Sequence, residues 1–368
     1  MPESSEPAKR FAYIDALRGY AILMVMAVHT SEAFPDLPAW LSKILSQGAR
    51  GVQLFFVTSA LTLSMSWVAR QETAVEFYIR RFFRIAPMFW IAIVVFVWID
   101  GTGPSMYAPE GIGFRHVAMT ALFVHGFWPD TITSVVPGGW SVANEVIFYA
   151  LFPLIVPSLL RANWKSLIIA AIVSVALGPQ LSRLESLSHF LPTSAEGVSG
   201  IYFSLWFPRQ LPCFIFGIML YRLSVERPPA PAPGAKAICL LAAALMLLIP
   251  FLEGIKYALP LGLSTTYAIA FSLFAFSLMN WPGSPLISNP ITWIGKVSYS
   301  AYFVHFLVLH FLPPIHLTGS PPADLAFAYI VTITVTIGIS SLTYLSIEKP
   351  LIQVGHGIVS RKSAHQAA

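Results

Sequence analysis

The sequence is short of charge. Only 11% of its 368 residues are Asp, Glu, Lys or Arg, whereas 56% are hydrophobic. A soluble globular domain carries about 25% charged residues, so this chain has too few of them to cover a surface that faces water. The surplus apolar surface must face lipid, which predicts an integral membrane protein.

Cysteine is nearly absent as well. The chain has two cysteines, Cys213 and Cys239, and both lie in apolar stretches. A disulfide scaffold or a cysteine metal cluster needs more of them, in polar loops. The nine histidines show no metal-ligand spacing, so we expect no metal site. The net charge of +5 is small and in a membrane protein reflects topology, so we expect no nucleic-acid partner.

Long apolar runs are what the sequence has instead. A helix needs about 20 mainly apolar residues to cross ~30 Å of hydrocarbon. Ten segments fit: 14–34, 49–69, 83–99, 140–160, 164–180, 206–224, 235–252, 259–281, 297–314 and 324–345. An eleventh, 113–127, is short and contains Arg115, His116 and His125. The runs do not alternate as barrel strands do, so they predict an all-α polytopic membrane helix bundle.

The distribution of basic residues predicts the topology, because cytoplasmic loops collect Lys and Arg. If the N-terminus is inside and 113–127 does not cross, 16 basic residues lie inside and 6 outside; if it does cross, the split is 10 to 12. We therefore expect ten crossings of the plasma (inner) membrane and one short non-crossing or re-entrant segment, with both termini cytoplasmic. Residues 1–350 form one membrane domain, 351–368 form a cytoplasmic tail, and 181–205 form a long outward loop.

Ionisable groups inside spans are costly and usually mark a site. The first span contains Asp15, Arg18 and, eleven residues after the arginine, His29. At 100° per residue this step is about 1100°, some 20° beyond three full turns, and rises about 16 Å. Arg18 and His29 therefore share one face. The structural alternatives are an interfacial Arg18 that pairs with Asp15, and a His29 that makes an interhelical hydrogen bond.

Two arginines, Arg81 and Arg84, lie one turn apart at the inner end of the third span. Two guanidinium groups at that place can hold a phosphate-bearing ligand in bidentate fashion. Anionic lipid headgroups are the alternative ligand.

Later spans hold further polar residues. Ser141 and Glu145 lie near the start of the fourth crossing, and Glu145 is expected to be an unpaired carboxylate, either scaffold or working group. Ser298, Tyr299 and His305 lie in the segment 297–314.

Taken in order, these segments resemble the acyltransferase-3 family of bacterial membrane acyltransferases, typified by O-antigen and exopolysaccharide O-acetylases. The resemblance extends from Tyr13 to Pro350. It rests on five motifs: Arg18 and His29 as Arg/Lys-x10-His, Phe55-Phe56-x-x-Ser59, Arg81-x-x-Arg84, Ser141-x-x-x-Glu145, and Ser298-Tyr299-Ser300 with His305.

The chain departs from the family pattern in two places. Gln53 stands where members usually have an acidic residue, and Ala60 where they have glycine. The soluble esterase-like domain that is fused to some members has no counterpart, so we expect the stand-alone form.

The resemblance implies a membrane O-acyltransferase. Such enzymes transfer an acetyl or other short acyl group from acyl-CoA to a hydroxyl of a carbohydrate-like acceptor, a surface polysaccharide or lipid-linked saccharide. The expected partners are the glycan acceptor, the lipid bilayer and the co-substrate acyl-CoA, with acetyl-CoA as its expected form. No bound cofactor is expected.

The acyltransferase hypothesis assigns a role to each candidate site residue. His29 is the general base, the usual work of an imidazole, and a transient acyl-His is the less favoured route. Arg81 and Arg84 hold the CoA end, with Arg18 nearby. Glu145 orients the imidazole or binds the acceptor. The remaining residues are supporting: Asp15, Ser141, Ser298 and Tyr299, the latter two as oxyanion donors, and His305, whose role is open.

Two other classes of protein fit the composition. A transporter or flippase of a polar lipid-linked substrate also has many spans with intramembrane charges, but such proteins often contain internal repeats and none is found. A non-catalytic membrane sensor or assembly partner would tolerate replacement of His29.

Overall fold

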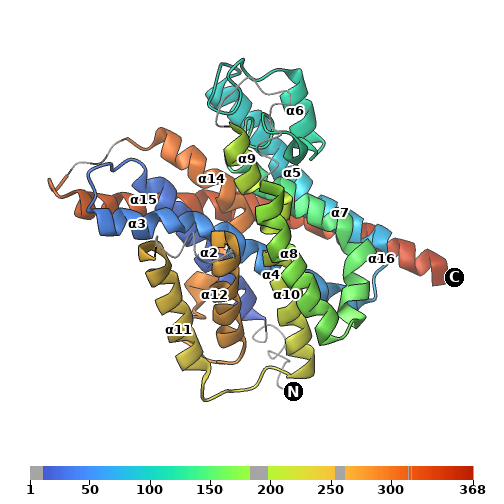
Figure 1. The fold of residues 1–368 in the computed structure, drawn as a ribbon. Helices are drawn as coiled ribbons and strands as arrows, with labels where there is room; N and C mark the ends of the chain where they lie inside the picture. The colour runs from blue at the N-terminus through green and yellow to red at the C-terminus, as the bar shows by residue number, and fades with distance from the viewer. Residues whose placement is uncertain (1–10, 183–197, 253–261, 314, 316, 368) are drawn as a thin grey trace, which may run out of the picture. The chain divides into compact units, whose positions relative to one another are not determined.

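The computed structural model describes residues 11–182, 198–252, 262–313, 315 and 317–367. Across these ranges all regular structure is helical, without a strand, which confirms the predicted all-α class (Figure 1). The chain divides into two compact units. The first unit consists of residues 1–63 and 213–342, and the second of residues 64–212 and 343–368.

Within the described residues, seven helical stretches are long and apolar enough to cross a membrane: Ala12–Ser31, Ala39–Arg70, Ala74–Asp100, Gly139–Arg161, Gly200–Glu226, Gly262–Met279 and Pro321–Arg361. They confirm the polytopic helix bundle. The other three predicted crossings are helical too, in α8 (Trp164–Ser182), α11 (Ala235–Leu248) and α14 (Ser298–Phe311). A 14-residue helix rises only about 21 Å, so the number of ten crossings stays a prediction.

The short segment 113–127 folds as the prediction requires. It forms α6 (Phe114–Ala121), of 8 residues, and the 3-10 turn η2 (His125–Phe127). Eight residues rise about 12 Å, less than half of the hydrocarbon thickness. This segment is therefore a non-crossing element. Of the predicted outward loop 181–205, residues 183–197 lie outside the described residues, as do residues 259–261 of one predicted crossing.

The first unit is built around α2 (Ala12–Ser31). Its other elements are α3 (Ala39–Ser46), η1 (Gln47–Arg50), most of α4 (Gly51–Arg70), most of α10 (Phe207–Glu226), α11, η4 (Ile249–Phe251), α12 (Gly262–Met279), α13 (Asn289–Lys296), α14 and α15 (Pro321–Thr343). Helix α2 packs against α12, α13, α14, α3 and η1.

Glycines let backbones approach α2 very closely. A Cβ atom on Gly295 would lie 1.7 Å from the carbonyl oxygen of Asp15, and one on Gly19 would lie 2.4 Å from the carbonyl oxygen of Ile291. Both distances are far below van der Waals contact, so only glycine fits at these helix crossings. Small residues thus fix α13 against the N-terminal half of α2.

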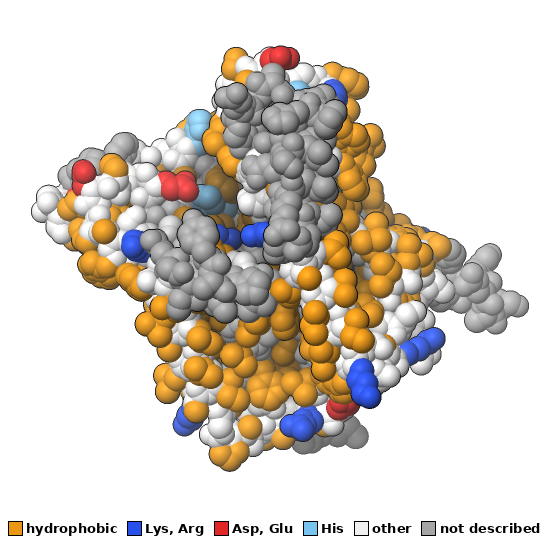
Figure 2. All heavy atoms as spheres, in the orientation of Figure 1, with side chains coloured by type: hydrophobic (Ala, Val, Ile, Leu, Met, Phe, Trp, Pro, Cys, Tyr) orange, Lys and Arg blue, Asp and Glu red, His pale blue; other side chains and the backbone are white. Residues whose placement is uncertain are grey.

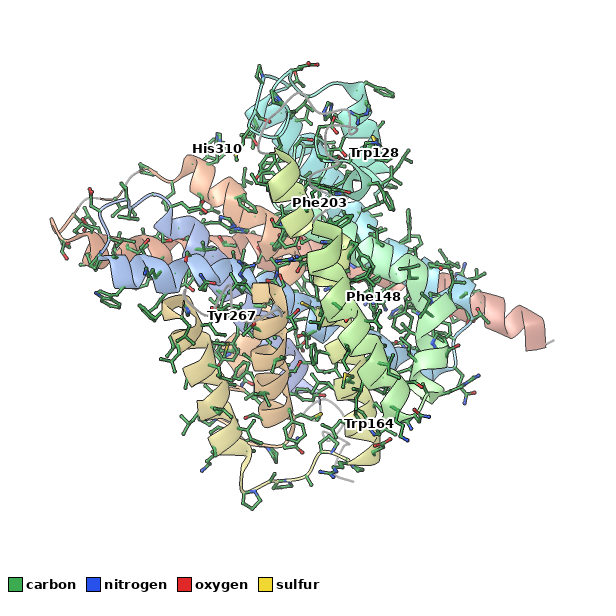
Figure 3. The ribbon with its side chains drawn as sticks, viewed as in Figure 1. Trp128, Phe148, Trp164, Phe203, Tyr267 and His310 are labelled. Carbon is green, nitrogen blue, oxygen red and sulfur yellow. The ribbon has the colours of Figure 1, made fainter. Side chains whose placement is uncertain are left out.

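Helices α11 and α12 form an antiparallel pair, and Figure 1 shows them side by side. The Ser277 hydroxyl donates to the Ala235 carbonyl oxygen at 2.9 Å, and the buried Tyr267 hydroxyl, labelled in Figure 3, donates to the Met246 carbonyl oxygen at 3.4 Å. Polar side chains are thereby satisfied inside the apolar pair.

The second unit contains α5 (Ala74–Asp100), α6, η2, α7 (Gly139–Arg161), α8, α9 (Val198–Leu205), the π-helical turn η6 (Tyr344–Glu348) and α16 (Lys349–Ala367). Helix α5 begins at a capping box between Thr73 and Glu76, which satisfies its first backbone N–H groups. It packs against α7, and Phe77 stacks on Phe152 with ring centroids 5.0 Å apart.

Helix α16 also packs against α5. A Cβ on Gly355 would lie 2.9 Å from Cβ of Phe83, so the absence of a side chain there permits the close contact. The segment predicted as a cytoplasmic tail is thus helical over its described part and joins α15 through η6. The division into a membrane domain 1–350 and a tail 351–368 stays a prediction.

The surface is largely apolar, as the composition requires. On α5, Trp90, Val94 and Trp98 are all exposed at intervals of four residues, which places them on one side of the helix. Figure 2 shows hydrophobic side chains over much of the visible face and few charged ones. Such a surface fits lipid and not water.

Candidate active site

Helix α2 carries polar residues in both of its halves, Asp15 and Arg18 near its start and His29 near its end. Because α2 is one uninterrupted helix from Ala12 to Ser31, Arg18 and His29 share a face as predicted, about 16 Å apart along the axis. Arg18 Nη1 lies 3.7 Å from Asp15 Oδ1, the contact that the structural alternative for Arg18 describes, and Arg18 Nη2 donates to Thr62 Oγ1 of α4 at 3.2 Å. Arg18 is therefore held from two sides.

His29 lies in the last turn of α2 and keeps 26% of its side chain exposed. Its Nδ1 is 3.2 Å from Glu32 Oε1 and 3.3 Å from Oε2. A carboxylate only accepts, so Nδ1 donates and the neutral imidazole carries its lone pair on Nε2. A base oriented in this way by a carboxylate is the arrangement that general-base catalysis needs.

A second imidazole, that of His305 on α14, lies beside His29. The ring centroids are 5.5 Å apart, and the Phe306 ring lies 4.7 Å from His29. His305 is completely buried and its Nδ1 lies 3.0 Å from the Ala301 carbonyl oxygen. The structure thus brings together the first-span histidine and the histidine of the last predicted motif, 276 positions later in the chain.

Ser298 and Tyr299 begin the same helix as His305. Six or seven residues of α-helix separate them from His305, a rise of about 9–10 Å. Ser298 is buried, and the Tyr299 ring meets Phe303 edge-on at 5.3 Å. Their role as oxyanion donors stays a prediction.

In the second unit the two predicted donor-binding arginines have different surroundings. Arg84 forms an ion pair with Glu348 of η6, a side chain with only 1% of its surface exposed. Arg81 lies over the Phe77 ring with its guanidinium carbon 5.8 Å from the centroid. Its Nε is buried without a hydrogen-bond partner among the described residues. Arg81 is therefore the better placed of the two to receive an anion.

Glu145 is not the unpaired carboxylate that the sequence suggested. Its Oε1 accepts a hydrogen bond from the Tyr149 hydroxyl, one turn along α7, at 2.5 Å. The carboxylate and the phenol also interact electrostatically with Arg81, and the Tyr149 ring lies 6.1 Å from the Phe77 ring. Only the unpaired state is wrong, because Tyr149 is an i,i+4 neighbour on the same helix; a hydrogen-bonded scaffold, one of the two alternatives for this buried acid, fits the observed bond.

Ser141 has a local structural contact. Its hydroxyl donates to the Gly138 carbonyl oxygen at 2.9 Å. Gly138 has φ 72, in the left-handed region where glycine has no steric penalty. Ser141 thus stabilises the turn from which α7 starts.

Outside the spans, His125 is a buried histidine with a structural environment. Its Nε2 lies 3.1 Å from the Gly139 carbonyl oxygen, and its ring stacks on Phe89 with centroids 5.5 Å apart. Burial lowers the pKa of His125 to about 4, because the imidazolium loses its hydration there. His125 is neutral at physiological pH and joins η2 to the start of α7.

The similarity of the chain to known proteins shows its family. Residues 11–344 match a family model described as an acyltransferase domain. The chain belongs to the acyltransferase-3 family. A Staphylococcus aureus (strain MRSA252) acyltransferase-3 relative, provisionally named an O-acetyltransferase, is 25% identical over 385 residues, which cover 96% of this chain and 59% of the relative.

A second acyltransferase-3 relative is O-acetyltransferase OatA of Staphylococcus aureus (strain NCTC 8325 / PS 47). It is 24% identical over 374 residues, 93% of this chain and 57% of the relative. The chain therefore spans less than three-fifths of the length of these relatives. No solved structure matches the chain significantly.

Two residues that contact candidate site residues were not predicted from the sequence. Glu32 could have been found from its i,i+3 spacing to His29, the spacing that places two side chains on one helix face. Glu348 is the partner of Arg84, which lies 264 positions away in the chain. No local pattern reveals a pair of that kind.

Proposed function

We propose that this protein is a membrane O-acetyltransferase that moves an acetyl or other short acyl group from acyl-CoA to a hydroxyl of a carbohydrate-like acceptor. A surface polysaccharide and a lipid-linked saccharide are the acceptor classes. The observation that carries the proposal is His29, whose Nδ1 is held by the Glu32 carboxylate while a quarter of the side chain stays exposed. Family membership and the names of the relatives support it.

In this mechanism His29 is the base. Nε2 takes the proton of the acceptor hydroxyl while the oxygen attacks the thioester carbonyl carbon, and a new C–O bond forms. The C–S bond then breaks, and the CoA thiolate takes the proton from the imidazolium and leaves as a thiol. Glu32 holds the Nδ1–H and stabilises the positive charge that the ring carries in between.

Orientation of the imidazole, one of the two roles predicted for Glu145, is thus assigned to Glu32. Glu145 keeps the other role, that of a carboxylate that binds the acceptor. Hydrogen bonding by Tyr149 fixes one of its oxygens, Oε1.

Binding of the acyl donor is assigned to Arg81. CoA is anionic and bulky, and a guanidinium group binds phosphate through two parallel N–H donors. Glu348 already accepts from Arg84, so Arg84 shapes the donor site and Arg81 contacts the phosphates. The expected location is the inner membrane with both termini cytoplasmic, which places the donor side toward cytosolic acyl-CoA.

The test uses inside-out membrane vesicles from cells that express the protein, with radiolabelled acetyl-CoA as donor and the acceptor present in the vesicles. Base-labile label in the glycan and lipid-linked fractions measures transfer. His29→Ala should lower turnover at least about a hundredfold, the usual contribution of a general base, with normal amounts of protein in the membrane.

His310→Ala is the matched control, because His310 is an exposed histidine on the same helix as His305 (Figure 3). Its transfer rate should stay at the wild-type level. Normal transfer by His29→Ala would refute the base assignment. Uptake of an intact labelled saccharide without acylation would favour the transporter hypothesis instead.

A further inference from the structure

His305 contains a buried polar atom that the fold leaves unsatisfied. The side chain has no exposed surface, and its Nε2 has no hydrogen-bond partner among the residues that the structure describes. Buried polar atoms are nearly always bonded, and an exception in a native fold calls for a reason. The imidazole therefore serves something other than ordinary packing.

The protonation pattern of His305 follows from its other nitrogen. Nδ1 lies 3.0 Å from the Ala301 carbonyl oxygen, one turn back on α14. A carbonyl oxygen only accepts, so Nδ1 donates, and Nε2 is left with its lone pair in the neutral ring. The unsatisfied atom is an acceptor, which is the negative end of the imidazole dipole.

The ring beside that of His305 belongs to His29, the proposed base. The His29 and His305 rings are 5.5 Å apart at an angle of 31°, and Phe306 packs against both, with centroids 4.7 Å from His29 and 4.0 Å from His305. The Phe306 ring supplies an apolar wall at this place, where a charge interacts strongly with nearby dipoles. When His29 becomes positively charged, its charge lies beside the His305 ring and interacts with the dipole of that neutral imidazole.

We propose that His305 is a positioning residue for acyl transfer, which acts through His29 by stabilising the imidazolium that forms when the acceptor hydroxyl loses its proton. No proton passes to His305. The proton moves from the hydroxyl to His29 Nε2 and from there to the CoA thiolate, while His305 stays neutral. The hydrogen bond to the Ala301 carbonyl oxygen already fixes the orientation of the His305 dipole, so the ring does not have to reorient during the reaction. The inference rests on the assignment of His29 as base.

Two substitutions separate the two nitrogens of His305. In His305→Asn the side-chain amide can still donate to the Ala301 carbonyl oxygen, but nothing replaces Nε2. In His305→Gln the longer side chain can place an acceptor oxygen near the former Nε2 position, and the Nδ1 contact is lost. Transfer from radiolabelled acetyl-CoA is measured in the inside-out vesicles, per amount of protein that elutes as a single folded species from detergent. Thermal melting of the same detergent-solubilised protein reports stability.

The two variants should rank in opposite order by turnover and by melting temperature. His305→Asn should melt close to wild type yet lose about tenfold or more in turnover, with the KM for acetyl-CoA unchanged. His305→Gln should melt lower and retain more turnover per folded molecule than His305→Asn. A purely structural role predicts instead that turnover falls in step with melting temperature in both variants, and that result would overturn the inference.

The outcomes also separate this inference from the proposed function. If His29→Ala retains transfer, the base assignment fails, and the role of His305 fails with it. If His29→Ala is inactive while His305→Asn turns over at the wild-type rate, the base assignment stands and the positioning role of His305 is wrong.

Discussion

The ion pair between Arg84 and Glu348 allows a sharp test of how the second unit is held together. Glu348 lies in the π-helical turn between α15 and α16 and is 1% exposed, while 26% of the Arg84 side chain is exposed. Removal of one partner from a buried pair costs about 3–5 kcal/mol, because the other charge stays behind without compensation. Water reaches the Arg84 end, so we expect about 2–3 kcal/mol for Arg84→Met.

The double variant Arg84→Met with Glu348→Gln should recover most of this loss. Neither side chain is then charged, and replacement of a buried pair by neutral groups of similar volume is often nearly neutral. In thermal melting of detergent-solubilised protein, about 2–4 °C per kcal/mol gives a drop of roughly 4–12 °C for the single variant. The double variant should melt within a few degrees of wild type.

A matched surface pair provides the control. Arg222 and Glu226 form an i,i+4 ion pair on α10 at 2.8 Å, with 28% and 38% of the side chains exposed. Such pairs contribute about 0–1 kcal/mol, so Arg222→Met should shift melting very little. If the double variant melts as low as Arg84→Met, or if Arg222→Met costs as much, burial of Glu348 is not what makes its pair important.

Three further predictions concern individual side chains. Glu32→Gln should lower turnover about tenfold or more with unchanged KM for acetyl-CoA, because an amide accepts from His29 but cannot balance its positive charge; equal turnover would exclude Glu32 as orienter. Arg81→Met should raise the KM for acetyl-CoA about tenfold, and Arg81→Lys should be intermediate because it lacks the planar fork; a change in acceptor KM alone would move the donor site elsewhere. Burial lowers the pKa of His125 to about 4, against 6.5 in the unfolded chain, so on acidification the unfolded chain binds the proton first. The free energy of unfolding is therefore highest above about pH 6.5 and falls by roughly 3 kcal/mol as the pH drops to about 4. His125→Gln should flatten the melting-temperature profile over this pH range, and an unchanged slope would contradict the prediction.

Much of the fold could be predicted from the sequence because lipid imposes a simple rule. Each crossing must be a long apolar helix, and every predicted span is helical over most of its described part. The face shared by Arg18 and His29 depends only on regular helix geometry, which α2 follows without a break. The contact between Arg18 and Asp15 is equally local.

The rest of the site depends on information that periodicity does not contain. His305 meets His29 only because α14 packs against α2. The difference between Arg81 and Arg84 arises from Glu348, which reaches α5 from the other end of the chain. Contacts of this kind are tertiary, so spacing treats the two arginines as equivalent.

The placement of the base at the end of α2 also accounts for the glycines around that helix. A catalytic side chain must be held within a fraction of an ångström, which favours rigid supports over loops. Cβ atoms on Gly48 and Gly51 would lie 2.3 Å from the carbonyl oxygens of Met24 and Ala21, so the backbone of the 47–51 segment lies directly against α2 in the half that bears His29. Because no flexible side chains lie between the two backbones, these contacts fix the position of α2 along its axis relative to the 47–51 segment. The imidazole at its end is then positioned by the helix, by Glu32 and by the ring of Phe306, as the proposed role of His29 as base requires.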